Sequence, residues 1–151
     1  MKLAEALVLR ADAQRRLEQL KQRVIRNAKV QQGDKPGEDP ARLITEFEAV
    51  AATLMDLIQR INKTNASARF QKSSLTDALA RRDVLRLREA LYRELAQAAS
   101  ITQSRTSKSE VKFRSAVSVA RIQKQADALA KEHRELDARI QESNWQIDLA
   151  D

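Results

Sequence analysis

The feature that most constrains the fold is the placement of the residues that break helices. Both glycines and both prolines of the 151-residue chain fall within one segment, GDKPGEDP at 33–40. Glycine and proline are the residues that most disfavour a helix interior. We therefore predict a turn at 33–40, with Asp39 as the N-cap of the next helix and Pro40 opening it.

Apolar side chains recur at helical spacing on both sides of this turn. Alternating steps of three and four residues run through 2–32 and again through 41–70, a pattern typical of amphipathic helices. A connection as short as 33–40 favours an antiparallel helical hairpin. The sequence therefore predicts two long helices lying side by side.

A second break, QKSS at 71–74, precedes a third helical segment. Ser74 and Asp77 have the spacing of a capping box, which predicts a helix over 75–100. The apolar side of this helix is expected to consist of Leu75, Leu79, Val84, Leu87, Leu91, Leu95 and Ala98.

The segment 101–117 is rich in serine and threonine and has no helical periodicity. Its apolar residues alternate with polar ones, so we predict an extended arm, either free or as a short strand or β-ribbon with another copy. Residues 118–147 hold one heptad register, which predicts a last helix. Trp145 lies on the opposite face of that register, as expected of a side chain that contacts a neighbouring element or subunit. The predicted oligomer contacts are Val111, Phe113, Val117 and Trp145.

Composition agrees with helices throughout. Aromatic residues make up only 3% of the 17.1 kDa chain, so its core must be built from leucine, isoleucine, valine and alanine. We predict an all-α fold in one domain over 1–151. It is a long antiparallel four-helix bundle, or coiled-coil hairpins, with a short extended or β arm before the last helix.

Several classes of protein and site are excluded by what the sequence lacks. Cysteine is absent, which excludes disulfides and thiolate metal sites and suits a reducing cytosol. The apolar stretch at the N-terminus is broken by Glu5, Arg10 and Asp12, so we expect no secretory signal. No run approaches the ~18 apolar residues of a membrane-spanning helix. We therefore expect a cytoplasmic protein without a membrane partner.

Catalytic and cofactor motifs are not found either. The single histidine, His133, has Ala130 rather than a glutamate three residues before it, so it does not fit a di-iron helical bundle. There is no glycine-rich phosphate loop, and one histidine without geometry does not support a Ser–His–Asp triad. We predict no cofactor, no metal and no catalytic residues.

The net charge of +7 is unevenly distributed. Residues 1–32 carry eight Lys/Arg and three Asp/Glu, and 101–117 carry four and one. The first helix has a basic face formed by Lys2, Arg15, Arg16, Arg23 and Lys29. We favour a solvated face that pairs with the acidic last helix. The alternative is a footprint for nucleic-acid phosphates or anionic lipid, without interleaved aromatics to stack on bases.

The segment RINKTNASARF at 60–70 contains two glycosylation sequons, at Asn62 and Asn65. Without a secretory route they are not glycan sites. Counting outward along both helices from the turn at 33–40 places Arg10 opposite residue 63. Counting across the second break at 71–74 places residue 82 near residue 62.

A buried arginine needs carboxylate or amide partners, so these positions predict an inter-helix polar layer. Its members are Arg10, Asn62, Asn65, Arg82 and Asp83. We favour a layer that fixes helix register and orientation. The alternative is a pocket between helices that binds an anion or a small polar ligand.

Four stretches together resemble a family of small bacterial helical proteins known as septicolysin-like. They are LRADAQRRLEQLKQRVIRNAKVQQGDKPGEDP, RINKTNASARF, LTDALARRDVL and HRELDARIQESNW. The resemblance runs end to end and implies an all-α, oligomeric bacterial protein. The family label implies cytolytic, membrane-directed activity, and no catalytic residues carry over from it.

The functional hypothesis from the sequence is a non-catalytic, homo-oligomeric assembly or interaction protein of the bacterial cytoplasm. The first alternative is a nucleic-acid binder that uses the basic helix face and the arm. The second alternative is a membrane-active protein, as the resemblance implies.

Overall fold

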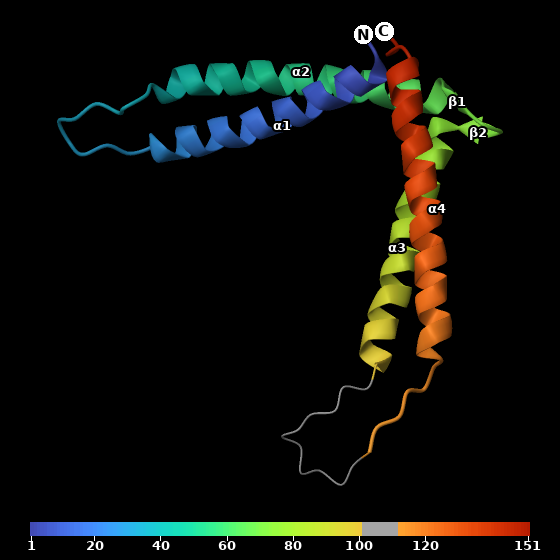
Figure 1. The fold of residues 1–151 in the computed structure, drawn as a ribbon. Coiled ribbons are helices and arrows are strands. Elements are labelled where there is room, and N and C mark those ends of the chain that lie inside the picture. Colours follow the sequence, from blue (N-terminus) through green and yellow to red (C-terminus); the bar gives the residue numbers. More distant parts are fainter. Residues whose placement is uncertain (101–111) are drawn as a thin grey trace. The chain divides into compact units, whose positions relative to one another are not determined.

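The structure is a computed structural model that describes residues 1–100 and 112–151. These residues form four α-helices and one two-stranded β-sheet (Figure 1). The elements are α1 (Leu3–Arg26), α2 (Pro40–Ser67), β1 (Arg69–Phe70), β2 (Ser73–Ser74), α3 (Leu75–Ala99) and α4 (Val119–Gln146). The predicted all-α class with four helices is confirmed.

Two compact units can be distinguished in the chain. The first comprises Met1–Arg69 and Glu142–Asp151, and the second comprises Phe70–Gln141. The single domain expected over 1–151 stays a prediction.

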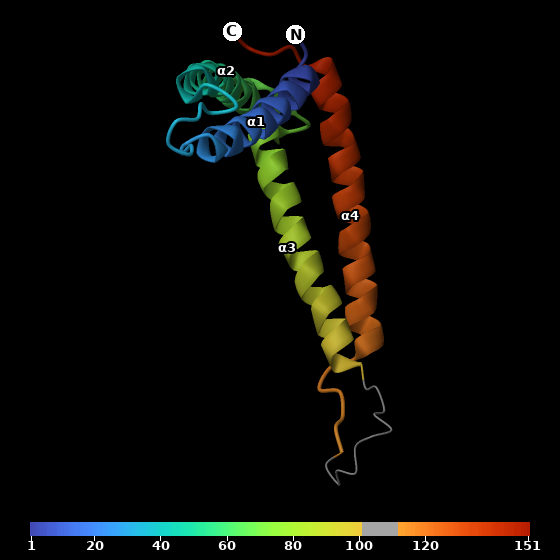
Figure 2. The ribbon, with the colours of Figure 1, turned by 90° about the vertical axis from the view of Figure 1, so that its left-hand side faces the viewer.

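The first unit is an antiparallel hairpin of α1 and α2, which lie side by side in both views (Figures 1 and 2). The Asp39 side chain accepts a hydrogen bond from the Ala41 N–H at 3.0 Å, and Pro40 opens α2, as the sequence predicts. Gly33 has φ +92°, a conformation that glycine adopts without strain.

The helix α1 ends at Arg26, several residues before the predicted end at 32. Asn27 accounts for this early end. Its side-chain amide donates to the Arg23 carbonyl at 2.9 Å, and its side-chain oxygen accepts from the Glu38 N–H at 3.1 Å. These bonds turn the chain out of the helix, so the connection runs over 27–39.

The core of the first unit is aliphatic. Its buried side chains include Leu3, Ala6, Leu20, Leu43, Leu57 and Ile61. Burial of one such large side chain contributes about 1.5–3 kcal/mol, so this row of contacts is the main attraction between the two helices.

The second unit pairs α3 with residues 119–141 of α4, again antiparallel and side by side in both views (Figures 1 and 2). The predicted capping box opens α3. The Asp77 N–H donates to Ser74 Oγ at 3.1 Å, and the Ser74 N–H donates to the Asp77 carboxylate at 3.3 Å. The predicted start of this helix is therefore confirmed.

The side of α3 that packs inward differs from the one expected. The buried residues of α3 are Leu75, Ala78, Leu85 and Ala96, of which only Leu75 belongs to the predicted apolar side. Both sets have helical spacing, so periodicity alone does not decide which one faces the neighbouring helix.

The predicted arm at 101–117 is described only in its last part. Residues 112–117 form neither helix nor strand, and 101–111, with Val111 among them, lie outside the described residues. The two strands of the described residues lie elsewhere, in the β1–β2 pair, whose turn places Gln71 at φ +53°. None of the described helices combines the length and apolar run that crossing a bilayer requires.

Candidate functional site

The chain segment after α4 is fixed to the start of α1. The Leu3 N–H donates to the Ile147 carbonyl, and the Leu149 N–H donates to the Met1 carbonyl, both at 2.9 Å. These two bonds form a short antiparallel bridge between stretches that lie far apart in the sequence.

Lys2 strengthens the bridge with its side chain. Its Nζ donates to the Gln146 carbonyl at 3.0 Å and lies 2.8 Å from the Asp148 carboxylate. The hydrogen bond from Lys2, and then its positive charge, hold the pKa of Asp148 below its usual range.

Thr64 connects the same segment to α2. Its side chain is only 2% exposed, and its Oγ1 donates to the Arg60 carbonyl at 2.7 Å and accepts from the Ala150 N–H at 2.9 Å. Arg60 Nε donates to the Ala150 carbonyl, and Lys63 Nζ donates to the Asp151 carbonyl, both at 2.9 Å. Backbone and side-chain bonds thus fix 147–151 against both helices of the first unit.

The last turn of α4, directly before this fixed segment, presents Trp145 at the surface. With Met1, Val8 and Leu9, Trp145 surrounds an open hollow of about 470 Å³ in which Glu5 is the one charged residue of the lining. All four apolar side chains are exposed, Trp145 by 60%. A cluster of large exposed apolar side chains is a candidate interaction site.

A second hollow, of about 480 Å³, adjoins the first and shares Met1 and Leu9 with it. It lies along α1 and α2. Its other lining residues are Asp12, Ala13, Arg16, Val50, Thr53, Asp56, Leu57 and Arg60. The two hollows together make a mainly apolar surface with charged side chains along it.

The second unit also has an apolar surface, on the side of α3 that does not pack inward. Val84, Leu87 and Leu91 are 54%, 71% and 63% exposed. Their spacing of three and four residues places them on one helix face. By the same geometry Arg81 and Arg88 lie along one flank of this face and Asp83 along the other. We call Val84, Leu87 and Leu91 the α3 stripe.

The opposite side of α3, toward α4, is more polar. Arg82 Nη1 lies 2.8 Å from the Asp137 carboxylate on that side, and Arg81 reaches from the flank of the α3 stripe to place its Nη2 2.6 Å from the Glu132 carboxylate. Burial acts to raise the pKa of Asp137. Hydrogen bonds from Arg82 and Gln141 and the nearby positive charges outweigh burial, so that pKa lies below its usual range.

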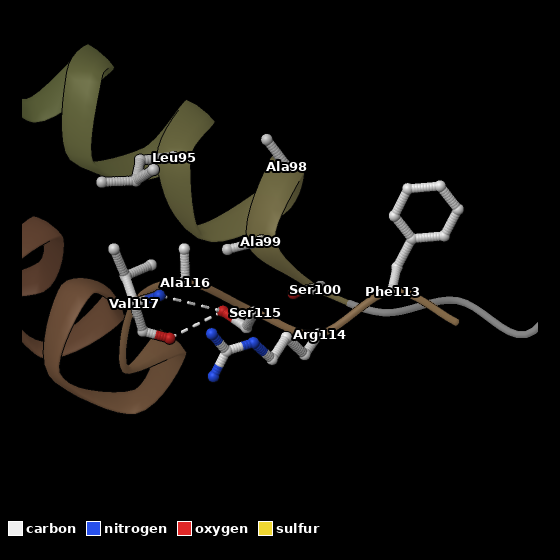
Figure 3. A pocket seen from close by; sticks show the side chains of 9 residues that line it. All are labelled: Leu95, Ala98, Ala99, Ser100, Phe113, Arg114, Ser115, Ala116 and Val117. Atoms are coloured by element: carbon white, nitrogen blue, oxygen red, sulfur yellow. Dashed lines mark hydrogen bonds between the residues drawn. The ribbon is translucent and has the colours of Figure 1, made fainter. Parts of the chain in front are cut away.

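A third hollow, of about 460 Å³, lies where α3 ends and the chain approaches α4 (Figure 3). Ser115 Oγ donates to the Val117 carbonyl at 2.6 Å and accepts from its N–H at 3.4 Å, which shapes the turn. Phe113 stands at the end of the hollow away from Leu95 and is 80% exposed (Figure 3).

The residues of the predicted polar layer do not lie at one level along the helices. Arg16 bonds to Glu46, so these two residues lie at the same level of the antiparallel hairpin. Six residues farther from the turn along each helix, Arg10 is level with residue 52 of α2. Residue 52 and Asn62 are about 15 Å apart along α2. The count from the sequence assumed a helix to 32, whereas α1 ends at Arg26. The structure therefore does not bring Arg10 level with the asparagines.

The individual members of that layer have different surroundings. Arg10 is half-buried, and its Nε has no hydrogen-bond partner among the described residues. Asn62 is exposed and Asn65 half-buried, while the threonine between them is buried. Arg82 and Asp83 lie in the second unit, where the Arg82 Nε is 3.8 Å from the Asp83 carboxylate. The ligand pocket proposed for this layer stays a prediction.

The predicted basic face carries ion pairs within its own unit. Arg15 pairs with Asp12, Arg16 with Glu46, Arg23 with Glu38, and Lys2 with Asp148, whereas Lys29 lies exposed beyond the end of α1. The hydrogen bonds from Arg23 and Arg16 lower the pKa values of Glu38 and Glu46, respectively. The carboxylates come from α1, α2 and their connection, and Asp148 follows α4.

The predicted oligomer contacts are exposed wherever they are described, with one exception. Trp145 and Phe113 project from the surface, and Val117 is half-buried beside the third hollow. In residues 1–100 and 112–151, no group of three or more acidic or histidine side chains is arranged to hold a metal ion.

Sequence reasoning missed the bridge between Met1–Leu3 and 147–151. It depends on backbone groups, which have no sequence signature at this separation. It also missed the exposure of the α3 stripe. A signal for that was available, because α3 has two different apolar stripes and one neighbouring helix covers only one of them.

The chain belongs to a family described as "Family of unknown function (DUF6847)", whose model matches residues 10–149. A solved structure similar to it is the "Crystal structure of a functionally unknown conserved protein from Corynebacterium diphtheriae". The two are 43% identical, the match covers 99% of each chain, and the TM-score is 0.95. A comparison with curated proteins gives no match.

These findings correct the resemblance drawn from the sequence. The septicolysin-like assignment is wrong, because the family that matches is a different one and the similar structure shows no link to septicolysins. The expectation of cytolytic activity rested on that resemblance and loses its basis.

Proposed function

We propose that this protein is a non-catalytic assembly protein of the bacterial cytoplasm whose copies pair through the α3 stripe. The observation that carries the proposal is the exposure of Val84, Leu87 and Leu91 on one face of a helix. Single exposed leucines are ordinary, but three at helical spacing form a continuous apolar strip of the kind that covers another helix.

The three residues of the stripe are all large and aliphatic, whereas the packed side of α3 combines buried leucine and alanine with polar residues. The inward side includes Arg82, Glu89 and Tyr92 at half-buried positions. A helix that places charged residues against its neighbour and large aliphatic residues outward is arranged for a second contact. Self-association supplies such a contact without any other component.

Charge supports one orientation for a pair of copies. In a parallel helix pair, the two different flanks of the stripe face each other, so Asp83 of each copy lies beside Arg88 of the other. In an antiparallel pair, like flanks meet and Arg88 approaches Arg88. We therefore propose a parallel, two-fold pairing of α3 with α3.

The expected affinity is modest. Burying the exposed part of each stripe residue contributes about 1–2 kcal/mol for each of the six side chains in a pair. Association costs of about 4 kcal/mol or more offset much of this gain. The proposed pair is therefore one that depends on concentration.

Nucleic-acid binding receives less support. The arginines proposed as its footprint already pair with carboxylates of the same unit, which lowers the positive potential available to phosphates. The cytoplasmic part of the proposal is supported by the absence of cysteine from the sequence.

Light scattering over a concentration series tests the proposal. The intact chain should rise in mass from monomer to dimer, and the double variant Leu87→Lys/Leu91→Lys should stay monomeric. The matched control is Ile25→Lys, which adds a charge at an exposed aliphatic residue of α1 and should leave the dimer intact. Circular dichroism checks that each variant is folded. An intact chain that stays monomeric at all concentrations contradicts the proposal.

A charge exchange tests the orientation. Asp83→Lys and Arg88→Glu should each weaken the dimer, because each places like charges opposite one another twice. The double variant restores the opposite charges and should recover most of the affinity. If the double variant is as weak as the single ones, the parallel arrangement is wrong.

A further inference from the structure

The hollow around Trp145 has the properties of a receptor for an aromatic side chain. Met1, Val8 and Leu9 supply aliphatic walls, and Trp145 supplies a ring against which a second ring can stack. Glu5 has the one charged side chain of its lining, whereas the adjoining hollow is balanced, with Asp12 and Asp56 beside Arg16 and Arg60. The hollow around Trp145 itself therefore suits an apolar side chain accompanied by positive charge.

The same chain carries a segment with those properties in its second unit. Phe113 is 80% exposed, more than any other large hydrophobic side chain in the described part of the chain. Its neighbours Lys112 and Arg114 are exposed and positively charged. An exposed phenylalanine between two cations is costly in water and complementary to an apolar hollow whose one charged side chain is a carboxylate.

We propose that Phe113 of one copy inserts into the hollow formed by Met1, Val8, Leu9 and Trp145 of a second copy. Lys112 and Arg114 then lie near the Glu5 carboxylate of that hollow. This inference rests on the proposed function in that both require self-association, but it uses different residues.

The contact joins two different surfaces and is therefore heterologous. A heterologous contact leaves one free Phe113 and one free hollow in every pair, so it continues until a ring closes or a filament forms. The pairing through the α3 stripe is two-fold and closes on itself. Together the two contacts would link dimers into larger assemblies.

The absence of cysteine allows a selective cross-linking test. Two single-cysteine chains are prepared, Val8→Cys in the wall of the hollow and Arg114→Cys beside Phe113. They are mixed in the presence of oxidised glutathione. Because each chain has one thiol, a disulfide between positions 8 and 114 reports only contact between two copies. It also requires Cα atoms within about 7 Å.

The mixture should yield the 8–114 disulfide as its main product. Adding Phe113→Ala to the Arg114→Cys chain should reduce its yield at least tenfold, and Phe113→Leu, which keeps an apolar side chain, should restore most of it. In the matched control, Ile25→Cys replaces Val8→Cys. Ile25 is also an exposed aliphatic residue of α1 but lies outside the hollow, so this chain should give little product with Arg114→Cys.

Four results overturn the inference. If Val8→Cys alone forms a disulfide dimer as readily as the mixture, the hollows face each other. If Phe113→Ala leaves the yield unchanged, the phenylalanine is not the inserted group. If light scattering shows the intact dimer but no 8–114 product forms, this contact is wrong while the pairing through α3 stands. A chain that is monomeric throughout removes both.

Discussion

The hydroxyl of Thr64 should be the most sensitive single polar group of the first unit. Thr64→Val keeps the shape of the buried side chain and removes its oxygen. The Ala150 N–H then loses the acceptor that it has at 2.9 Å. An unsatisfied donor costs about 1–3 kcal/mol, and because Ala150 is half-buried we expect about 1–2 kcal/mol.

A matched control separates this tertiary contact from the local one. Thr45 Oγ1 donates to the Ala41 carbonyl at 3.0 Å, which is the same local bond that Thr64 Oγ1 makes to the Arg60 carbonyl. Unlike Thr64, Thr45 is exposed. Thr45→Val should change the free energy of unfolding by less than about 0.5 kcal/mol. Thr64→Ser keeps the hydroxyl and loses one methyl group, for about 0.8 kcal/mol.

Urea unfolding measures the three free energies, and amide hydrogen exchange at Ala150 reports on the contact itself. Thr64→Val should lower the melting temperature by about 2–8 °C for a chain of this size and speed exchange at Ala150. Equal costs for Thr64→Val and Thr45→Val, with unchanged exchange at Ala150, would refute the role given to Thr64.

Two further predictions concern stability. Leu20→Ala, at a side chain 1% exposed, should cost about 2–5 kcal/mol in urea unfolding. Ile25→Ala, at one 68% exposed, should cost less than about 0.5 kcal/mol, and equal costs would contradict the core described. The pKa values of Glu38, Glu46 and Asp148 are lowered in the folded state, so they stabilise it above the ordinary carboxyl pKa of about 4. That stability is lost as pH falls through the lowered values, and a flat unfolding free energy from pH 5 to pH 2 would contradict this.

The local signals in the sequence predicted the helices well. The cap at Asp39 with Pro40 and the capping box of Ser74 with Asp77 both occur where their residue types require them. Such caps act within a few residues, so the sequence contains all that is needed to find them. The end of α1 was placed too late, because Asn27 stops the helix through a bond to Glu38 in the connection.

The candidate surfaces could be predicted only in part. The sequence singled out Trp145 and Phe113 as contacts with another copy, Trp145 because it lies opposite the heptad register and Phe113 because it lies in the predicted arm. It did not locate the hollow beside Trp145, since that hollow depends on Met1 being held by the Leu149 N–H. For α3, apolarity favoured Val84, Leu87 and Leu91 as the packed side, whereas contact with α4 selects Leu85 and Ala96.

The pairing of α3 with α3 is tested most directly by distances between two copies. One spin label is placed at Thr76→Cys in one sample and at Gln97→Cys in another, both exposed positions near opposite ends of α3 in a chain without other cysteines. In a parallel pair with helix axes about 8–10 Å apart, both samples should give short label-to-label distances. The parallel pairing is contradicted if neither sample gives a short distance. It is also contradicted if the Gln97→Cys labels lie about 30 Å apart, the distance expected in an antiparallel pair centred on Leu87.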